Sequence, residues 1–124
     1  RGEIAACYKG VPQNEIGIRT DVLDNVSKST GLKMLIRSMS PKVISTDEIG
    51  DIKDVEAIQY GICCGIKGIF TAHGNNLNDI SLNPALKSLI EMYVFDRIIT
   101  LDKSKVDRIG KIYRLDKNKK EYII

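Results

Sequence analysis

The sequence has no tryptophan, a single histidine, three cysteines and no long apolar run. The single histidine argues against a structural zinc site. Cys63 and Cys64 are adjacent and Cys7 is remote, so the cysteines form neither a disulfide framework nor a CxxC pair. No apolar run approaches the about 20 residues of a membrane span, and the first residues show no signal-peptide pattern. These absences favour a protein of a reducing, cytosolic compartment without a membrane span.

The composition is that of one folded domain at most, because 124 residues with 43% hydrophobic and 28% charged side chains suit a globular core. Aromatic residues make up only 6%, so aliphatic side chains must fill that core. The net charge of +3 is too small to require a nucleic-acid partner.

The charge is concentrated near the C-terminus, where residues 101–124 hold eight Lys or Arg against four Asp or Glu. Such a patch can contact nucleic acid or an anionic membrane surface. Nucleic-acid binders usually interleave aromatic side chains with the charges, and here only Tyr113 and Tyr122 do so. We therefore interpret residues 102–124 as a solvated hairpin with a basic tail, and we do not expect nucleic acid as a partner.

Turn-forming residues dominate the first 31 positions, and the short apolar pieces among them keep neither the helical nor the strand period. We expect a long loop over residues 1–31, and loops of this length are usually functional or contact a partner. A helix-spaced apolar set then ends before Pro41, and a short strand opens at Val43. The members of that set are Leu32, Leu35, Ile36 and Met39.

Two further helices carry clear start signals. Asp51 is the expected N-cap of one, with Asp54 in its first turn, and Asn83 followed by Pro84 restarts another. Gly61 and a second glycine four residues later, Gly65, fall inside the first of these helices. Each glycine costs about 1 kcal/mol relative to alanine, so we expect that face to pack closely against a neighbour.

The order of elements is loop, helix, strand, helix, strand, helix, strand, strand. This alternation predicts an α/β fold with a mainly parallel sheet flanked by helices, ending in an antiparallel hairpin. Residues 32–101 would form the αβαβαβ core.

An apolar strand delivers two adjacent acids in "VISTDEIG", which resembles a Walker B motif. Ligands bind at the carboxyl ends of parallel strands in such sheets. Asp47 would hold Mg²⁺ through water, and Glu48 would polarise the attacking water. The alternative is a strand followed by an ordinary acidic turn. In "TAHG", His73 ends the next expected strand at the same edge, where it would contact a γ-phosphate or simply be a strand-end residue.

The chain resembles the stage III sporulation protein AA family of endospore-forming bacteria from Arg1 to about Tyr113. The specific pieces are "RTDVLD", "LIRSMSP", "DEIG" and "TAHG". The resemblance implies a RecA-like ATPase domain akin to the motors of type II and type IV secretion. It further implies ATP and Mg²⁺ as cofactors, a hexamer, and a cytoplasmic place in the mother cell beside membrane-associated sporulation proteins.

The phosphate loop of that family, GxxxxGK(S/T), is missing from these residues. The chain starts at Arg1 rather than Met, and we expect it to be the C-terminal part of a longer ATPase. Without the loop there is no nest of backbone N–H groups for the phosphates, so this part alone would be inactive. By the same resemblance Glu3 would belong to an acidic box beside the water nucleophile and the nucleotide.

Three arginines are candidates for stabilising phosphate charge, because the planar guanidinium donates two parallel hydrogen bonds. The related motors place an arginine like Arg37 near the γ-phosphate, so Arg37 comes first and Arg19 second, whereas Arg97 suits a surface ion pair better. We expect Arg37 to act within its own subunit and Arg19, on the long loop, to act on a neighbouring one.

The sequence therefore predicts an ATPase that energises a secretion-type complex between mother cell and forespore. Two alternatives stay open. One is an assembly module whose nucleotide site is vestigial, and the other is a basic nucleic-acid translocase.

Overall fold

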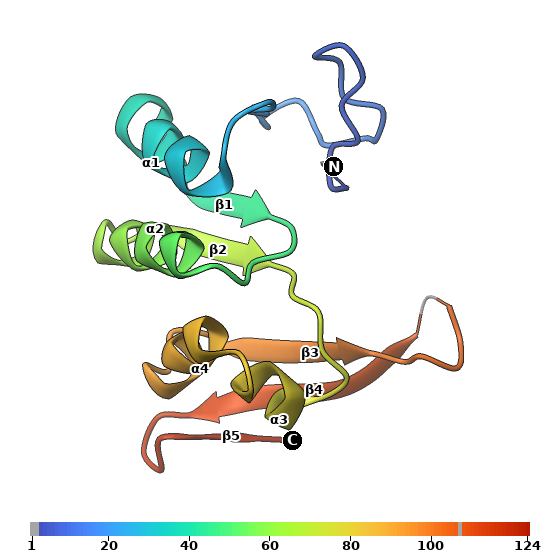
Figure 1. Ribbon diagram of the computed structural model, residues 1–124, viewed down its shortest axis with the longest axis vertical. Coiled ribbons are helices and arrows are strands. Elements are labelled where there is room, and N and C mark those ends of the chain that lie inside the picture. The colour runs from blue at the N-terminus through green and yellow to red at the C-terminus, as the bar shows by residue number, and fades with distance from the viewer. Residues whose placement is uncertain (1–2, 107) are drawn as a thin grey trace. The chain divides into compact units, whose positions relative to one another are not determined.

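The computed structural model describes residues 3–106 and 108–124 and divides into two compact units, Arg1–Ala72 and His73–Ile124 (Figure 1). Over its described residues the first unit runs α1 (Lys28–Met39), β1 (Val43–Thr46), α2 (Ile52–Cys63) and β2 (Lys67–Phe70). The second runs α3 (Leu77–Ser81), α4 (Pro84–Glu91), β3 (Arg97–Leu101), β4 (Ile109–Asp116) and β5 (Glu121–Ile123).

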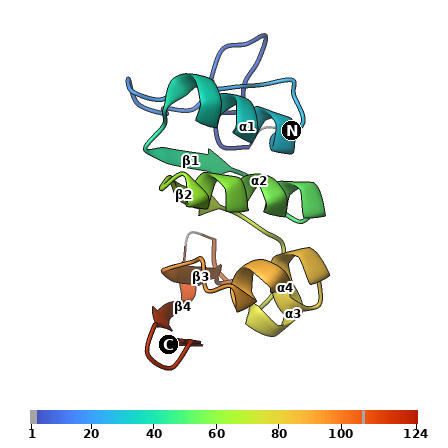
Figure 2. The ribbon, with the colours of Figure 1, turned by 90° about the vertical axis from the view of Figure 1, so that its left-hand side faces the viewer.

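In the first unit β1 and β2 form a parallel pair, with Val43 opposite Lys67 and Thr46 opposite Phe70. The helix α2 connects the two strands, and α1 packs beside α2, so both helices cover the same face of the pair, as Figure 2 shows from the helix side. Because the strands are parallel, both carboxyl ends reach the same edge. The buried apolar side chains of this unit are Ala5, Leu32, Ile44, Ile49, Val55, Ala57 and Ile58.

The long loop that the sequence predicts is present, since residues 3–27 contain no helix or strand. An isolated bridge between Tyr8 and Val11 closes a tight turn with two backbone hydrogen bonds of 2.9 Å. Ile18 lies in a later turn of this loop and is fully exposed, at 102%. The loop therefore contributes little to the core of its own unit.

The first helix starts earlier than predicted, at Lys28 rather than at Leu32. Its first turn gives no apolar signal, and Ser27 at the N-cap makes no side-chain capping bond. Gly31 also weakens the pattern, and a Cβ there would lie 3.0 Å from Cγ1 of Val26, so a larger residue would require Val26 to shift by a few tenths of an ångström.

The start of α2 is as predicted. The side chain of Asp51 accepts a hydrogen bond from the backbone N–H of Lys53 at 2.9 Å, and the backbone N–H of Asp51 donates to Oδ2 of Asp54 at 3.4 Å. This reciprocal capping box fixes the first turn of the helix and places Asp54 in the interior.

The expectation that Gly65 lies inside this helix is wrong. The helix ends at Cys63, and Gly65 has a φ of +77°, a left-handed conformation that suits glycine. Its N–H donates to Ile62 O at 2.9 Å and the N–H of Ile66 donates to Gly61 O at 3.1 Å, which is a Schellman motif. Only Gly61 fulfils the expected packing role, since a Cβ there would lie 3.3 Å from Cδ1 of Ile36 on α1.

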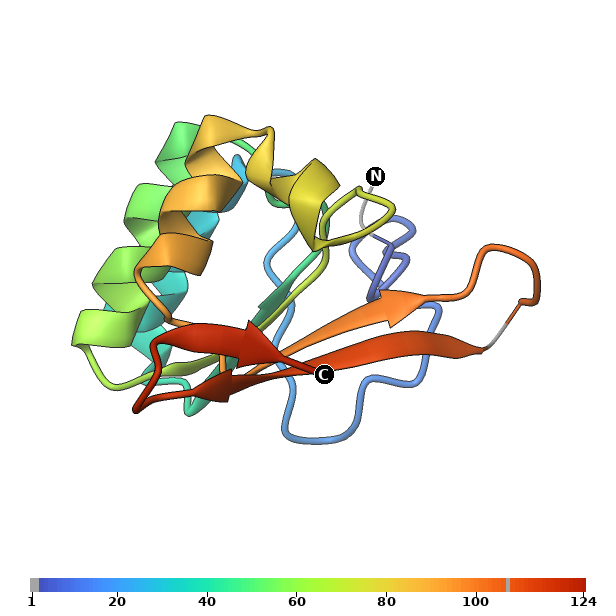
Figure 3. The same cartoon turned by 90° about the horizontal axis from the view of Figure 1, so that it is seen from below.

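The second unit packs α3 and α4 with an antiparallel sheet of order β3-β4-β5 (Figure 3). Asn83 caps α4 as predicted, its Oδ1 accepting from the N–H groups of Ala85 and Leu86 at 2.9 and 3.4 Å, with Pro84 in the first helical position. The sequence predicts the β3–β4 hairpin but not β5, whose three residues are too few for a periodic signal.

Parallel pairing is thus confined to β1 and β2 among the described residues, and β3, β4 and β5 pair antiparallel. A larger, mainly parallel sheet stays a prediction. Of the helices described, none combines the length and the apolar character that crossing a bilayer requires.

Candidate functional site

The two acids of the Walker B-like sequence, Asp47 and Glu48, form a turn directly after β1, here called the acidic turn. Asp47 is half-buried and Glu48 is exposed. The backbone of Glu48 has a φ of +47°, in the left-handed region that residues other than glycine rarely adopt. Such a conformation persists only where neighbouring contacts stabilise it.

Thr71, the first residue after β2, provides one set of these contacts. Its Oγ1 accepts a hydrogen bond from the N–H of Glu48 at 3.0 Å, and its carbonyl accepts from the N–H of Ile49 at 2.8 Å. Its own N–H donates to Thr46 O at 3.3 Å. Hydrogen bonds therefore join the ends of β1 and β2 at the acidic turn. The two motifs follow neighbouring strands, since "DEIG" comes after β1 and "TAHG" comes after β2.

Lys28, the first residue of α1, provides the second set. Its Nζ donates to the backbone carbonyl of Asp47 at 3.1 Å and to that of Glu48, and it lies 3.8 Å from Oδ2 of Asp54. Asp54 is only 6% exposed, and a buried carboxylate requires a charged or hydrogen-bonding partner. One ammonium group thus connects α1, the acidic turn and the first turn of α2.

Glu3 approaches the site through its backbone, because its N–H donates to Oδ2 of Asp47 at 2.7 Å. Asn14 fixes this segment, since its Nδ2 donates to the carbonyls of Glu3 and Ile4 at 3.3 and 2.9 Å. The side chain of Glu3 is exposed. The backbone of Glu3 thus lies beside Asp47, and the expected place of Glu3 in an acidic box beside the water nucleophile stays a prediction.

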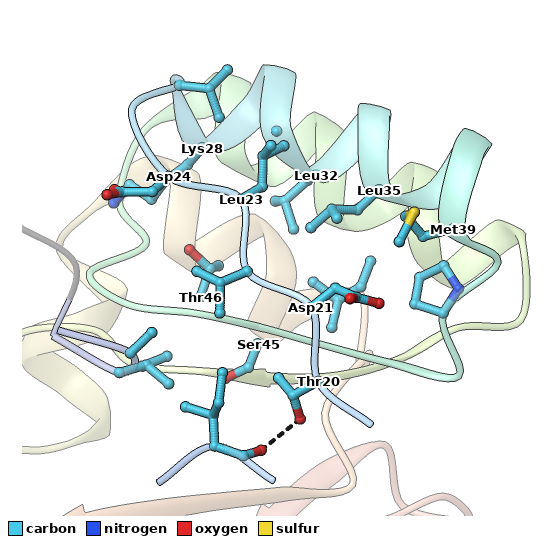
Figure 4. Close-up of a pocket in the computed structure, with 18 of the residues that line it drawn as sticks. Thr20, Asp21, Leu23, Asp24, Lys28, Leu32, Leu35, Met39, Ser45 and Thr46 are labelled. Carbon is cyan, nitrogen blue, oxygen red and sulfur yellow. Dashed lines mark hydrogen bonds between the residues drawn. The ribbon is translucent and has the colours of Figure 1, made fainter. Parts of the chain in front are cut away.

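A cavity of about 1110 Å³ lies between the long loop, α1 and β1, with the acidic turn at its margin (Figure 4). Figure 4 shows Lys28 and Thr46 at one end of this cavity and Met39 at the other, with Leu32 and Leu35 along the helix between them. Lys28 and Asp24 therefore lie toward the end of β1, whereas Asp21 lies toward the Met39 end of the cavity.

The structure separates the two preferred arginines. Arg19 is exposed on the long loop and lines the cavity. Arg37 is in the last turn of α1, nine residues after Lys28, and at a rise of 1.5 Å per residue that is about 14 Å along the axis. Its guanidinium lies over the ring of Tyr60, 5.8 Å from the centroid. This placement argues against the expectation that Arg37 acts on the acidic turn of its own subunit.

His73 is exposed and is the first residue of the second unit. Arg97 is exposed at the start of β3, in the same unit, and donates to the carbonyl of Asp96 at 2.8 Å. The predicted contact of His73 with phosphate stays a prediction.

Asp47 can bind a magnesium ion only as one ligand among several. No group of three or more His, Cys, Asp or Glu that would enclose a metal occurs in residues 3–106 and 108–124. Mg²⁺ in proteins often binds one or two carboxylates and completes its shell with water and substrate phosphates. A half-buried carboxylate beside a cavity suits that mode of binding, in which Asp47 holds a water of the ion.

Lys28 and Thr71 are the site residues that the sequence did not single out. Lys28 carried a weak signal, because a positive charge in the first turn of a helix opposes the helix dipole and needs a compensating contact. Thr71 belongs to the motif "TAHG", in which the sequence favours His73 as the functional residue.

Comparison with known proteins identifies relatives of this chain. The model of a family described as "Sporulation stage III, protein AA" matches residues 1–121. Stage III sporulation protein AA of Bacillus subtilis (strain 168) is 43% identical over 119 residues, which is 95% of this chain and 39% of that protein. No solved structure matches significantly. The chain thus spans about two fifths of the curated relative that it matches.

Proposed function

The chain belongs to the stage III sporulation protein AA family, and from this premise we propose that it carries the magnesium- and water-binding half of an ATP-hydrolysing site. The observation that supports the proposal is the acidic turn. Two adjacent carboxylates lie at the carboxyl end of β1, beside a cavity, on a backbone held in an unusual conformation. Acids so placed in an α/β sheet are suited to bind a nucleotide-bound cation.

In this proposal Asp47 would hold Mg²⁺ through water, and the bound ion would supply neutralisation of phosphate charge. Glu48 accepts a proton from the water that attacks the γ-phosphate. Its exposed side chain is at the margin of the cavity, where water has access. His73 contacts the phosphate that is released, and Arg19 stabilises negative charge from a neighbouring subunit.

The phosphate-binding loop must come from another part of the protein, since the 124 residues contain no GxxxxGK(S/T) run. We propose that this part completes a RecA-like domain in which β1 and β2 belong to a larger parallel sheet. The exposed loop of residues 10–27 would lie on a neighbouring subunit in a hexamer. Its poor burial and the full exposure of Ile18 support that role.

The biological role proposed is to energise a secretion-type complex between mother cell and forespore, from the cytoplasmic side and through membrane-associated sporulation proteins. The test is magnesium-dependent ATP hydrolysis by the purified full-length protein. A full-length protein that binds its partners but neither binds nor hydrolyses ATP would instead support the assembly module. Strongly salt-dependent DNA binding would support the translocase.

A further inference from the structure

The backbone of Glu48 is held at both of its polar groups by residues from other elements. Its N–H donates to Oγ1 of Thr71 at 3.0 Å, and its carbonyl accepts from Nζ of Lys28. The residue between these two contacts has a φ of +47°. A left-handed residue directs its side chain differently from an extended one, so the two contacts fix the direction in which the Glu48 side chain leaves the main chain.

The ammonium group of Lys28 has three hydrogens, and the structure gives it three partners: the carbonyls of Asp47 and Glu48 and the carboxylate of Asp54. Lysine is poorly suited to the first position of a helix, where the dipole disfavours positive charge. The first turn of α1 contains no acidic residue that would compensate. The position is therefore explained by the contacts of Nζ and not by helix formation.

We propose that Lys28 and Thr71, together called the Glu48 clamp, are positioning residues of the proposed general base, Glu48. This inference rests on the proposed ATPase function, which it deepens. The clamp keeps the Glu48 carboxylate directed at the attacking water while Lys28 ties that direction to the starts of α1 and α2. Movement of either helix is thereby transmitted to the acid.

A simpler role for Lys28 would be to neutralise the buried charge of Asp54. The two roles make different predictions for a double variant. If neutralisation is the whole function, removing both charges in Lys28→Met/Asp54→Asn restores the site. If the carbonyl contacts matter, the double variant regains stability but leaves the acidic turn without its donor.

The experiment uses the full-length protein and two readouts. Hydrogen exchange followed by mass spectrometry reports on the backbone N–H groups of Glu48 and Ile49, and steady-state kinetics give kcat and KM for ATP. The variants are Lys28→Met, Lys28→Met/Asp54→Asn and Thr71→Val, which keeps the shape of the side chain but removes the acceptor Oγ1. Lys33→Met, an exposed position on the same helix, is the matched control.

We expect Lys28→Met and Thr71→Val to speed exchange at the acidic turn about tenfold or more, because Thr71→Val removes the acceptor of the Glu48 N–H and Lys28→Met removes the donor that holds the carbonyls of the turn. They should lower kcat about 10- to 100-fold with KM for ATP changed less than about twofold, as expected for a displaced catalytic group. The double variant should regain the urea midpoint but neither kcat nor protection. Lys33→Met should change nothing.

Recovery of kcat and of protection in the double variant would overturn the proposal for Lys28, as would unchanged exchange in Lys28→Met. Should Lys28→Met fail to fold, Thr71→Val decides the matter alone, since unaltered exchange and kcat in that variant refute the clamp. If the wild-type protein shows no ATP hydrolysis, the proposed function fails, whereas the exchange measurements still establish or refute the clamp.

Discussion

The backbone N–H of Glu3 donates a hydrogen bond to Oδ2 of Asp47, with 2.7 Å between nitrogen and oxygen, across 44 positions of sequence. A carboxylate offers about four acceptor positions on its two oxygens, so this bond leaves capacity for the water of a hydrated ion. The contact also orients the carboxylate group. Asp47 is therefore held by main chain on one side and is available to solvent at the cavity on the other.

Removal of the proposed general base should abolish turnover without abolishing binding. In the full-length protein, Glu48→Gln keeps size and polarity but cannot accept the proton, so kcat should fall by about 10²–10⁴ while ATP still binds. Asp47→Asn should instead weaken the magnesium-dependent part of binding, measured by titrating Mg²⁺ at fixed ATP. Glu56→Gln, at an exposed position of α2, is the control and should be silent. Small and equal effects at Asp47 and Glu48 would indicate an ordinary acidic turn.

The 124-residue chain alone should bind ATP weakly, with a Kd of about 1 mM or higher. Its sequence has no glycine-rich loop that would surround the phosphates with N–H groups, and no lysine following such a loop. Isothermal titration calorimetry with Mg²⁺ present measures this directly, with the full-length protein as the positive control. Micromolar binding by the short chain would contradict the proposed division of the site.

Mixing two inactive variants distinguishes action within a subunit from action between subunits. Arg19→Ala and Glu48→Gln proteins should each be nearly inactive, and mixed rings should recover part of the ATPase rate if Arg19 acts on a neighbour. An arginine supplied in this way is worth about 10³–10⁵ in rate in other nucleotide hydrolases. Mixing Arg37→Ala with Glu48→Gln should recover too, because Arg37 lies at the far end of α1 from its own acidic turn.

The control for this experiment is the Arg97→Ala protein, which should keep its ATPase activity without being mixed with another variant. Recovery in the Arg37 mixture but not in the Arg19 mixture would contradict the proposal that Arg19 acts on a neighbouring subunit. An absence of recovery in the Arg37 mixture would restore the sequence-based expectation that Arg37 acts within its subunit.

The second unit should lose stability in alkali through Tyr122. Burial raises the pKa of its hydroxyl above the ordinary value of 10, although the N–H of Phe95, 3.3 Å from that oxygen, opposes the shift. The folded state thus holds this proton more tightly than the unfolded state. The stabilisation is complete below pH 10 and is lost as pH rises through the pKa of the folded state. Urea unfolding between pH 8 and about pH 11 should show a steeper decline for wild type than for Tyr122→Phe, with Tyr8→Phe, at an exposed ring, as the control.

The sequence predicted those elements whose signals are local. The caps at Asp51 and Asn83 lie within three residues of the groups they bind, so composition alone reveals them. The helix periods of α2 and α4 and the β3–β4 hairpin are local in the same sense. The boundaries were less accurate where a glycine was involved, because Gly31 continues a helix and Gly65 ends one, and only tertiary packing and φ distinguish the two cases.

The candidate site was predicted only in part, because only some of its residues belong to a local pattern. Asp47 and Glu48 were recognisable because two acids after an apolar strand are a local pattern. Lys28 is 19 positions from Asp47 and Thr71 is 23 positions from Glu48, so a local pattern of a few residues contains only one partner of each contact. Arg37 is in the last turn of α1 and Lys28 is at its start, so a sequence pattern that marks one helix does not show which of its ends lies near the acidic turn.

The Schellman motif at Gly65 has a consequence for which loops this fold tolerates. It reverses the chain in few residues, so that Lys67 enters the sheet opposite Val43 and Thr71 arrives beside the N–H of Glu48. Side chains alternate faces along a strand, and a single residue inserted after Gly65 would therefore exchange the two faces of β2. The same insertion would carry Oγ1 of Thr71 away from its donor. The length of this connection, at the opposite end of β2 from Thr71, thus determines whether the acidic turn keeps its contact with Thr71.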